Sequence, residues 1–276
     1  MVQRFVRTAV RHALLLGLCA VALIPFCFMW VSALKGRVAF ARDPLGLPWP
    51  PTAENFAAVF GQSAFARWML NSLLLTVASV VLTLLVSAPA AYAFARIPFR
   101  GRRILFGVVS ALMAVPVIAV IVPLFALMVK AGLINTYPAA IAVYCGFMVP
   151  YTTFFLTGFF SRLPRGIFDA AVMDGCSHGM LLRKVALPLS APAVVTLAIV
   201  NALWVWNELL ISLVLLQADE MRTLMVGLTV FQDRFGVNVP ATMAGLTVSV
   251  LPILILYVGG LRYFVSGLTV GALKGE

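Results

Sequence analysis

The sequence predicts an all-α polytopic membrane protein with six transmembrane helices and both termini in the cytoplasm. Three observations predict this class: the composition, six long apolar runs, and an uneven distribution of basic residues between the loops. Of 276 residues, 63% are hydrophobic and 11% are charged, whereas soluble domains are roughly half apolar and a quarter charged. A chain with so few polar residues cannot cover itself in water, which excludes an ordinary soluble domain.

Each apolar run is long enough to cross a bilayer as a helix, which needs about 20 residues. The runs cover about 13–34, 69–95, 104–129, 136–160, 190–216 and 241–261. No ten-residue alternation typical of transmembrane β-strands recurs, so the spans are predicted to be helices. Together they predict a single transmembrane domain over residues 1–276. Pro116 and Pro123 lie inside the third run and are expected to bend it.

The basic residues behind the net charge of +11 are distributed unevenly between the two sides of the membrane. With six spans, thirteen of the twenty basic residues fall on the side of the termini and seven on the other. Basic residues near span ends keep their loops in the cytoplasm, so both termini are predicted to be cytoplasmic. This topological use of charge argues against nucleic-acid binding.

Metal or disulfide chemistry has little support in the sequence. The four cysteines lie at positions 19, 27, 145 and 176 and form no Cys-x-x-Cys pair. The two histidines, His12 and His178, are far apart in the chain. No metal site is therefore predicted. No Gly-x-x-x-x-Gly-Lys-Ser/Thr phosphate loop occurs either, so the chain lacks this device for holding ATP.

The most informative segment lies between the fourth and fifth runs, at about residues 162–188. Pro164 is expected at the first position of a short helix, and Gly175 suits the left-handed residue that ends it. Asp174 can hydrogen-bond the turn. Ser177 is expected to cap a second helix that runs through Leu187, before a bend into the fifth span.

Within this segment, Asp169-Ala170-Ala171 is followed three residues on by Asp174-Gly175, and then by Leu187-Pro188. This pattern closely resembles the cytoplasmic coupling loop, or EAA motif, of ABC importer permeases. The resemblance implies a type I ABC importer permease architecture, in which these seven residues contact a separate ATPase. The family's usual Glu is Asp169 here, one methylene shorter, which implies a weaker or relayed contact. The alternative is an ordinary amphipathic loop on the membrane.

A second passage narrows the resemblance. Trp204, Trp206, Asn207 and Glu208 resemble the Trp-Asn-Glu/Asp segment in the fifth span of carbohydrate permeases, and residues 262–275 resemble the C-terminus of the maltose-type subunit. A charge at mid-membrane costs about 2.5–3.5 kcal/mol, so Glu208 suits a water-filled pathway. Tryptophan stacking and polar contacts to a sugar are one interpretation of this passage. The other interpretation is a helix–helix hydrogen bond with an interfacial aromatic belt, and it is favoured over direct contact with a sugar.

Two outer segments complete the pattern. The stretch 35–68 is rich in proline, and Thr52 is expected to cap a short interfacial helix with Phe56, Val59 and Phe60 on one face. The loop at about 217–240 is the expected contact for an extracytoplasmic binding protein.

The resemblance also implies partners and a location. These are a second homologous permease subunit, two ATPase subunits that bind ATP and Mg, an extracytoplasmic solute-binding protein, and the lipid bilayer of the bacterial inner membrane. The chain itself is expected to bind no cofactor and to catalyse no reaction. The implied function is uptake of an oligosaccharide, disaccharide, polyol or glycerol phosphodiester. An ion-coupled secondary transporter is the alternative, which usually shows more buried ionisable groups than the single intramembrane Glu found here.

Overall fold

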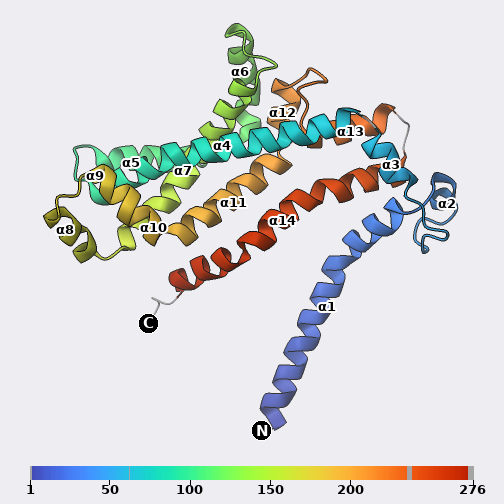
Figure 1. Cartoon of the computed structure of the whole chain (residues 1–276), viewed down its shortest axis with the longest axis horizontal. Helices are drawn as coiled ribbons and strands as arrows, with labels where there is room; N and C mark the ends of the chain where they lie inside the picture. The colour runs from blue at the N-terminus through green and yellow to red at the C-terminus, as the bar shows by residue number, and fades with distance from the viewer. Residues whose placement is uncertain (1, 62, 235–237, 273–276) are drawn as a thin grey trace. The chain divides into compact units, whose positions relative to one another are not determined.

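The computed structural model describes residues 2–61, 63–234 and 238–272, with side chains described for 7–61, 64–229 and 238–261. Every regular element in the described residues is a helix, which agrees with the predicted all-α class. In chain order the elements are α1 (Val2–Ala33), α2 (Arg37–Arg42), α3 (Glu54–Phe60), α4 (Ser63–Arg96), α5 (Arg102–Leu112), α6 (Val117–Lys130), α7 (Tyr137–Arg162), α8 (Arg165–Met173), α9 (His178–Met180), η1 (Leu181–Ala186), α10 (Leu187–Leu189), α11 (Ala191–Asn207), α12 (Leu210–Leu215), α13 (Leu224–Arg234) and α14 (Val239–Ala272) (Figure 1).

Four continuous helices are long and apolar enough to cross a membrane: Arg7–Ala33, Ala64–Arg96, Tyr137–Arg162 and Val239–Leu261. Two further pairs qualify only if each counts as one broken span. These are Arg102–Leu112 with Val117–Lys130, bent by 95°, and His178–Leu189 with Ala191–Asn207, bent by 80°. The structure thus supports four to six crossings, and α1, α4, α7 and α14 coincide with four of the predicted runs.

The third predicted run, 104–129, is not one helix but two. A proline bend was expected, but the chain breaks over residues 113–116. Pro116 is the N-cap of α6, with φ −75° and ψ 139°. Proline has no N–H and disfavours helical geometry in the residue before it, so α5 ends before Pro116 and α6 begins after it. Pro123, in contrast, lies within α6.

The fifth predicted run, 190–216, is also interrupted. Helix α11 ends at Asn207, Glu208 is extended with φ −72° and ψ 126°, and α12 begins at Leu210. No proline lies at this break. Glu208 lies at the break, and the contacts of its side chain are described with the site.

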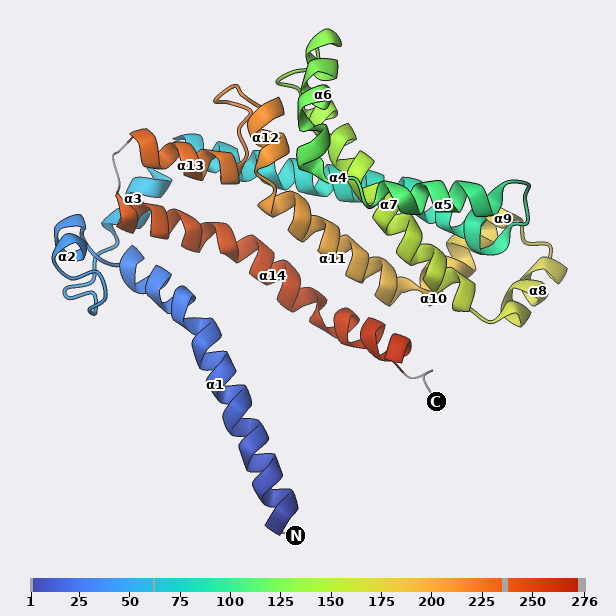
Figure 2. The ribbon, with the colours of Figure 1, turned by 180° about the vertical axis from the view of Figure 1, so that it is seen from behind.

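The chain divides into two compact units. The larger comprises residues 67–226 and 253–276. Within it, α8, α9 and α10 lie at one end of α7 and α11, while α6 and α12 lie at the other end, as both views show (Figures 1 and 2). Two buried clusters organise the ends of this unit. One centres on Tyr144, Ile211 and Leu215 near α12, and the other on Tyr92, Phe160 and Phe168 near α8.

The smaller unit comprises residues 1–66 and 227–252. Its outer segment is held by Asn55 of α3, whose Nδ2 donates to the Ala33 carbonyl at 2.8 Å and to the Lys35 carbonyl at 2.7 Å. Lys35 is buried, and its Nζ donates to the Asp43 carbonyl at 2.7 Å. Gly245 of α14 allows close packing here, because a Cβ at this position would lie 2.8 Å from Leu228 Cδ2.

The predicted short helix after the prolines is confirmed as α3, but its cap is shifted by one residue. Ala53 is the N-cap, and the Thr52 hydroxyl accepts from the Glu54 N–H at 3.2 Å. The predicted apolar face is only partly right. Val59 is buried, whereas Phe60 is 62% exposed, and the polar Asn55 takes a buried position instead because it satisfies the carbonyls at the end of α1.

Replacing Asn55 by Ala is expected to loosen residues 36–53 locally. The substitution removes two donors and leaves two carbonyls in a buried setting, at a cost of about 1–3 kcal/mol. Hydrogen–deuterium exchange of this segment should rise accordingly. The matched control is Glu54→Gln, at the exposed neighbour in the same helix turn. Equal exchange in both variants would show that Asn55 does not anchor the segment.

Candidate functional site

The coupling segment forms a helical hairpin, defined here as residues 163–189. Its first arm is α8, and Pro164 is its N-cap rather than its first helical residue as predicted. The turn follows the prediction at Gly175, whose φ is +80°. The Gly175 N–H donates to the Val172 carbonyl at 2.9 Å and the Cys176 N–H to the Ala171 carbonyl at 3.0 Å. This pair of bonds is the Schellman arrangement that ends helices at a left-handed residue.

The second arm begins where the sequence predicts. The Ser177 hydroxyl accepts from the Met180 N–H at 3.5 Å and is the N-cap of α9. The predicted single helix through Leu187 is wrong in two respects. It continues to Leu189, and its central six residues, Leu181–Ala186, are π-helical. The bend into the fifth span falls at Ser190, between Pro188 and Pro192, and measures 80°.

The hairpin is fastened to the end of α4 by Arg96 and Tyr92. Arg96 Nη2 donates to the Phe160 carbonyl at 2.6 Å and to the Leu163 carbonyl at 2.5 Å. Its guanidinium carbon also lies 4.1 Å from the centre of the Phe168 ring, which makes a cation–π contact. Tyr92 lies against both arms, with its ring centre 6.5 Å from that of Phe168 and its hydroxyl 3.4 Å from His178 Nδ1.

Phe168 is the side chain of α8 that enters the core. It is 6% exposed and packs with Leu156, Leu181 and Leu197, which belong to α7, η1 and α11. One cluster therefore joins both arms of the hairpin to three long helices. The sequence patterns did not predict these contacts. The sequence feature that could have indicated these contacts is the pair Tyr92 and Arg96, an aromatic and a basic residue one helical turn apart.

The residues predicted to meet an ATPase lie on the outside of the hairpin. Asp169, Ala170, Asp174, Gly175 and Pro188 are exposed, and Ala171 and Leu187 are half-buried. Near them, Met173 is 86% exposed and Val172 is 53% exposed. The hairpin thus presents a mixed face of carboxylates, small residues and apolar side chains.

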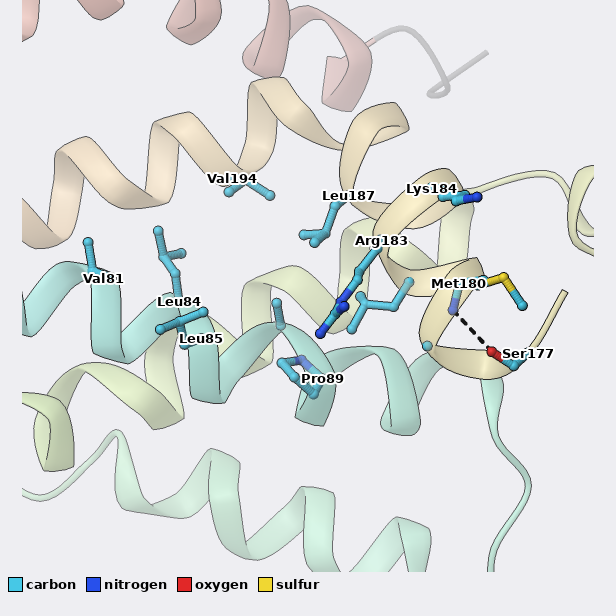
Figure 3. A pocket seen from close by; sticks show the side chains of 13 residues that line it. Val81, Leu84, Leu85, Pro89, Ser177, Met180, Arg183, Lys184, Leu187 and Val194 are labelled. Atoms are coloured by element: carbon cyan, nitrogen blue, oxygen red, sulfur yellow. Dashed lines mark hydrogen bonds between the residues drawn. The ribbon is translucent and has the colours of Figure 1, made fainter.

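A groove of about 790 Å³ runs between the second arm and α4. Its α4 side is apolar, with Val81, Leu84 and Leu85, and its hairpin side carries Arg183 and Lys184 (Figure 3). The second arm stands off α4 along this groove. Beside the groove, Ala88 and Ala91 of α4 belong to the same buried cluster as Leu181 and Ala186 of the second arm.

Glu208 causes the break in the fifth span. Its Oε1 accepts from the Ile211 N–H at 2.8 Å, and its Oε2 accepts from the Ser212 N–H at 3.2 Å. These are orphan donors at the start of α12, which a carboxylate caps well. Tyr144 of α7 adds a bond from its hydroxyl to Oε2 at 3.2 Å and lies 2.5 Å from Ser212 Oγ. The favoured interpretation, a bond between helices, describes this geometry.

The other predicted pathway residues are arranged differently from one another. Trp204 makes an edge contact with the Tyr144 ring and a tilted contact with Phe147. Trp206 is only 5% exposed, so within this chain it packs rather than faces an open path. Asn207 is exposed, and its Nδ2 donates to the Leu203 carbonyl at 2.7 Å. The structure brings Trp204 and Glu208 together on Tyr144, but not all four residues.

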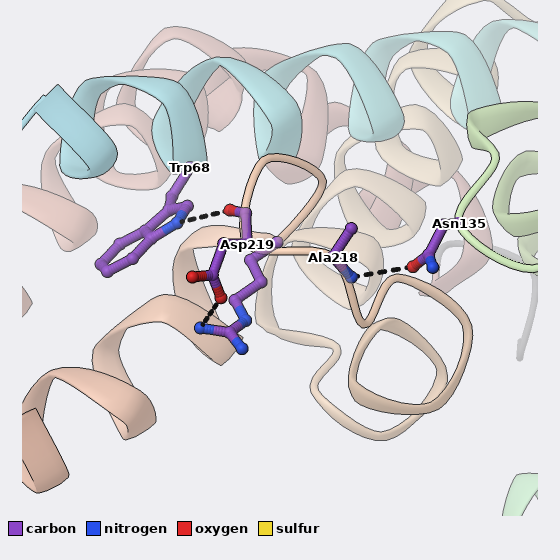
Figure 4. A network of polar contacts seen from close by, with 5 residues as sticks. Trp68, Asn135, Ala218 and Asp219 are labelled. Atoms are coloured by element: carbon purple, nitrogen blue, oxygen red, sulfur yellow. Dashed lines mark hydrogen bonds and ion pairs between the residues drawn. The ribbon is translucent and has the colours of Figure 1, made fainter.

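At the opposite end from the hairpin, α4 holds the loop that follows α12. Asn71 Nδ2 donates to the Glu220 and Arg222 carbonyls at 2.8 and 2.9 Å, and its Oδ1 accepts from the Tyr137 hydroxyl at 2.7 Å. Asn135, with φ +58°, accepts from the Ala218 N–H at 2.8 Å, and Trp68 Nε1 donates to the Asp219 carbonyl at 3.4 Å (Figure 4). These bonds give residues 217–223 a defined shape.

Residues 85–270 match the family described as the binding-protein-dependent transport system inner membrane component. The chain belongs to this family. The family is a transport component rather than a catalytic one, and it lies in the membrane. The match covers the hairpin, the Glu208 break and the loop held by Asn71.

Relatives from this permease family align over nearly the whole length of the chain. The arabinooligosaccharides transport system permease protein AraQ of Halalkalibacterium halodurans is 34% identical and covers 92% of this chain and 92% of its own length. The trehalose/maltose transport system permease protein MalG of Thermococcus litoralis is also 34% identical, over 96% of this chain and 98% of its own. The chain is similar to one chain in a crystal structure of a bacterial ABC transporter involved in the import of the acidic polysaccharide alginate. The TM-score is 0.80 at 25% identity, over 93% of this chain and 96% of that one.

Two further expectations concern metals and the C-terminus. Within the described part of this permease, no group of three His, Cys, Asp or Glu side chains is placed to hold a metal ion. The C-terminal motif at 262–275 lies outside the residues whose side chains are described.

The left-handed turn of the hairpin yields a matched pair of variants. At both Gly175 and Gly179 an added Cβ meets no atom within 4 Å, but only Gly175 has a positive φ. Gly175→Ala is expected to destabilise the hairpin by about 1–2 kcal/mol, because a Cβ is strained in the left-handed region. Gly179→Ala should be neutral or slightly stabilising, since alanine favours helix. Thermal unfolding of the detergent-purified chain measures both. Equal destabilisation by the two alanines would contradict the assigned turn.

The capping role of Glu208 is tested by truncation. Glu208→Ala leaves the Ile211 and Ser212 N–H groups without their carboxylate and is expected to cost about 1–3 kcal/mol. Gln217→Ala, in the exposed segment just after α12, is the control, because its side chain donates to the Val214 carbonyl at the end of α12 and not to the start of that helix. The measurement is again thermal unfolding in detergent. If Glu208→Ala cost no more than Gln217→Ala, the carboxylate would not be holding the break.

Proposed function

We propose that this chain is the permease subunit of a binding-protein-dependent ABC importer, and that its solute is a sugar or a sugar-like molecule. The observation that carries the proposal is the exposed face of Asp169, Ala170, Asp174 and Gly175, on a hairpin fastened to α4, α7 and α11. A surface that is exposed yet rigidly attached can pass force from a partner to the helices.

The solute class rests on the relatives. The names of two aligned permeases specify arabinooligosaccharides and trehalose or maltose, and the structural neighbour belongs to an importer of alginate. All of these are saccharides. Disaccharides and oligosaccharides are therefore the first solutes to test, with polyols and glycerol phosphodiesters after them.

For the topology, we propose six crossings and cytoplasmic termini within a single domain, residues 1–276. The pair α5 and α6 then counts as one crossing, while the fifth crossing begins at Ala191, so that the 80° bend before it lies at the edge of the membrane. The excess of basic residues on the side of the termini supports this orientation. It places the hairpin in the cytoplasm, and the Asn71-held loop outside, in a bacterial inner membrane.

Two ATPase subunits, which bind ATP and Mg, and a second permease subunit complete the proposed assembly. When the ATPases close on ATP, the hairpin moves with them. The long helices follow the hairpin, because Phe168 and Arg96 attach it to them. The expected response is rigid-body rearrangement of α4, α7 and α11. Contacts between the hairpin and the ATPases that differ between the open and closed states of the ATPases couple ATP hydrolysis to opening of the solute pathway. The shorter Asp169 carboxylate contacts the ATPase in this scheme.

On the outer side, the segment 217–240, predicted as a loop but including helix α13, is proposed to receive the solute-binding protein. Its first residues are held in place by Asn71 and Asn135, which gives the partner a defined surface to meet. Along the pathway, Glu208, Trp204 and Asn207 are proposed to line or shape the outer part of the route. Trp206 is proposed to pack behind them, since it is buried.

The complete importer tests this function by uptake into proteoliposomes. The full chain, its co-purifying subunits and its binding protein should accumulate a labelled oligosaccharide only when ATP is supplied inside. Asp169→Ala is expected to lower solute-stimulated ATP hydrolysis and uptake about tenfold, while Asp169→Glu retains both, because the coupling contact needs a carboxylate.

The control for that experiment is Glu54→Ala, an exposed carboxylate on the proposed outer side, which should leave uptake unchanged. Uptake driven by an ion gradient without ATP would instead identify a secondary transporter. ATP-driven uptake that survives Asp169→Ala would keep the importer but remove Asp169 from its coupling.

A further inference from the structure

A second groove, of about 1510 Å³, lies at the turn between α4 and α5. It is formed by the end of α4, the start of α5 and the last turns of α7, which packs along α5. None of the proposed coupling or pathway residues lines it. Its lining combines three arginines with a row of phenylalanines.

The arginine rim of this groove consists of Arg102, Arg103 and Arg162. The first two begin α5, directly after Gly101, whose φ of +81° turns the chain at this point. Arg162 is the last residue of α7. All three side chains are exposed, and no acidic residue is among those that line the groove. The rim therefore concentrates positive charge from two separate segments at one opening.

The phenylalanine floor is continuous. Phe106 contacts Phe94 with ring centres 5.4 Å apart and stacks on Phe154 at 5.8 Å with an interplanar angle of 11°. Phe154 in turn meets Phe155 at 5.4 Å, edge to face. Phe154 and Phe155 are 38% and 40% exposed. Gly158 leaves the floor open beside them, because a Cβ there would meet nothing within 4 Å.

We propose that this groove binds an anionic phospholipid of the cytoplasmic leaflet. The phosphate lies on Arg102, Arg103 and Arg162, and an acyl chain lies along the phenylalanine floor. Guanidinium groups match phosphate oxygens in charge and geometry, and basic pockets between membrane helices on the cytoplasmic side suit anionic headgroups. The inference rests on the proposed orientation of the chain and is independent of its solute.

General attraction of basic loops to an anionic membrane would make a different prediction. It depends on the number of charges near the surface, so any two arginines on that side would contribute alike. A built site depends on where the arginines are and on the open floor below them. Arg7 and Arg11 of α1 lie on the same proposed side and outside the groove, so they provide the matched control.

The test is native mass spectrometry of the delipidated complex, purified through a tag on this chain and titrated with lipid. Dioleoyl phosphatidylglycerol is compared with dioleoyl phosphatidylcholine, which has the same chains and no net charge. Arg102→Gln with Arg162→Gln is expected to weaken phosphatidylglycerol binding by about 25-fold, roughly fivefold per arginine. Arg7→Gln with Arg11→Gln should leave it unchanged. Gly158→Leu, which fills the floor and keeps the charges, should weaken it as well.

Three results would overturn the proposal: equal losses from the two arginine pairs, full binding in Gly158→Leu, or displacement of the lipid by soluble glycerol phosphate. If Gly158→Leu lowers the yield, Ile104→Glu replaces it, since Ile104 lines the groove and is 73% exposed, so that a carboxylate there repels the phosphate. The assay uses neither sugar nor ATP. The lipid-binding result can therefore be interpreted even if the transport proposal fails.

Discussion

The contact of Arg96 with the hairpin is the interaction on which the rest of the structure depends. One guanidinium closes the chain between α7 and α8 by binding the Phe160 and Leu163 carbonyls, and it covers the Phe168 ring. Hydrogen bonds from a charged donor are stronger than neutral ones. Without this contact, α8 would depend on the packing of Phe168 for its attachment to the long helices. With this contact, the hairpin is rigidly connected to the long helices.

Breaks in helices are the second organising principle of this chain. Proline makes the break before α6 by removing a donor, while Glu208 makes the break before α12 by satisfying donors that a continuous helix would have used internally. The two breaks meet in one cluster, because Ile121 of α6 packs with Ile211 and Leu215 of α12. A long span built of two pieces can change its angle at the break, which a continuous helix resists.

Local signals predicted much of the hairpin. Gly175 and Ser177 act within one turn of chain, so their roles as left-handed residue and cap follow from residue type alone. Four long spans followed from hydropathy in the same way. The break at Glu208 did not, because the same residues also suit a continuous helix, and only Tyr144, 64 residues away, shows which form holds. The roles of Arg96 and Phe168 and the π-helical arm likewise depend on packing between distant segments.

Crosslinking from the hairpin tests the central claim most directly. A single cysteine at position 170, exposed on α8, would be placed in a chain whose four native cysteines are replaced, and joined to its neighbours by a short bifunctional reagent in native membranes. The expected result is a product that contains the ATPase subunit, with no labelling of this cysteine by impermeant reagents from outside the cell. A cysteine that reacts from the outside, or that never reaches an ATPase, would contradict it.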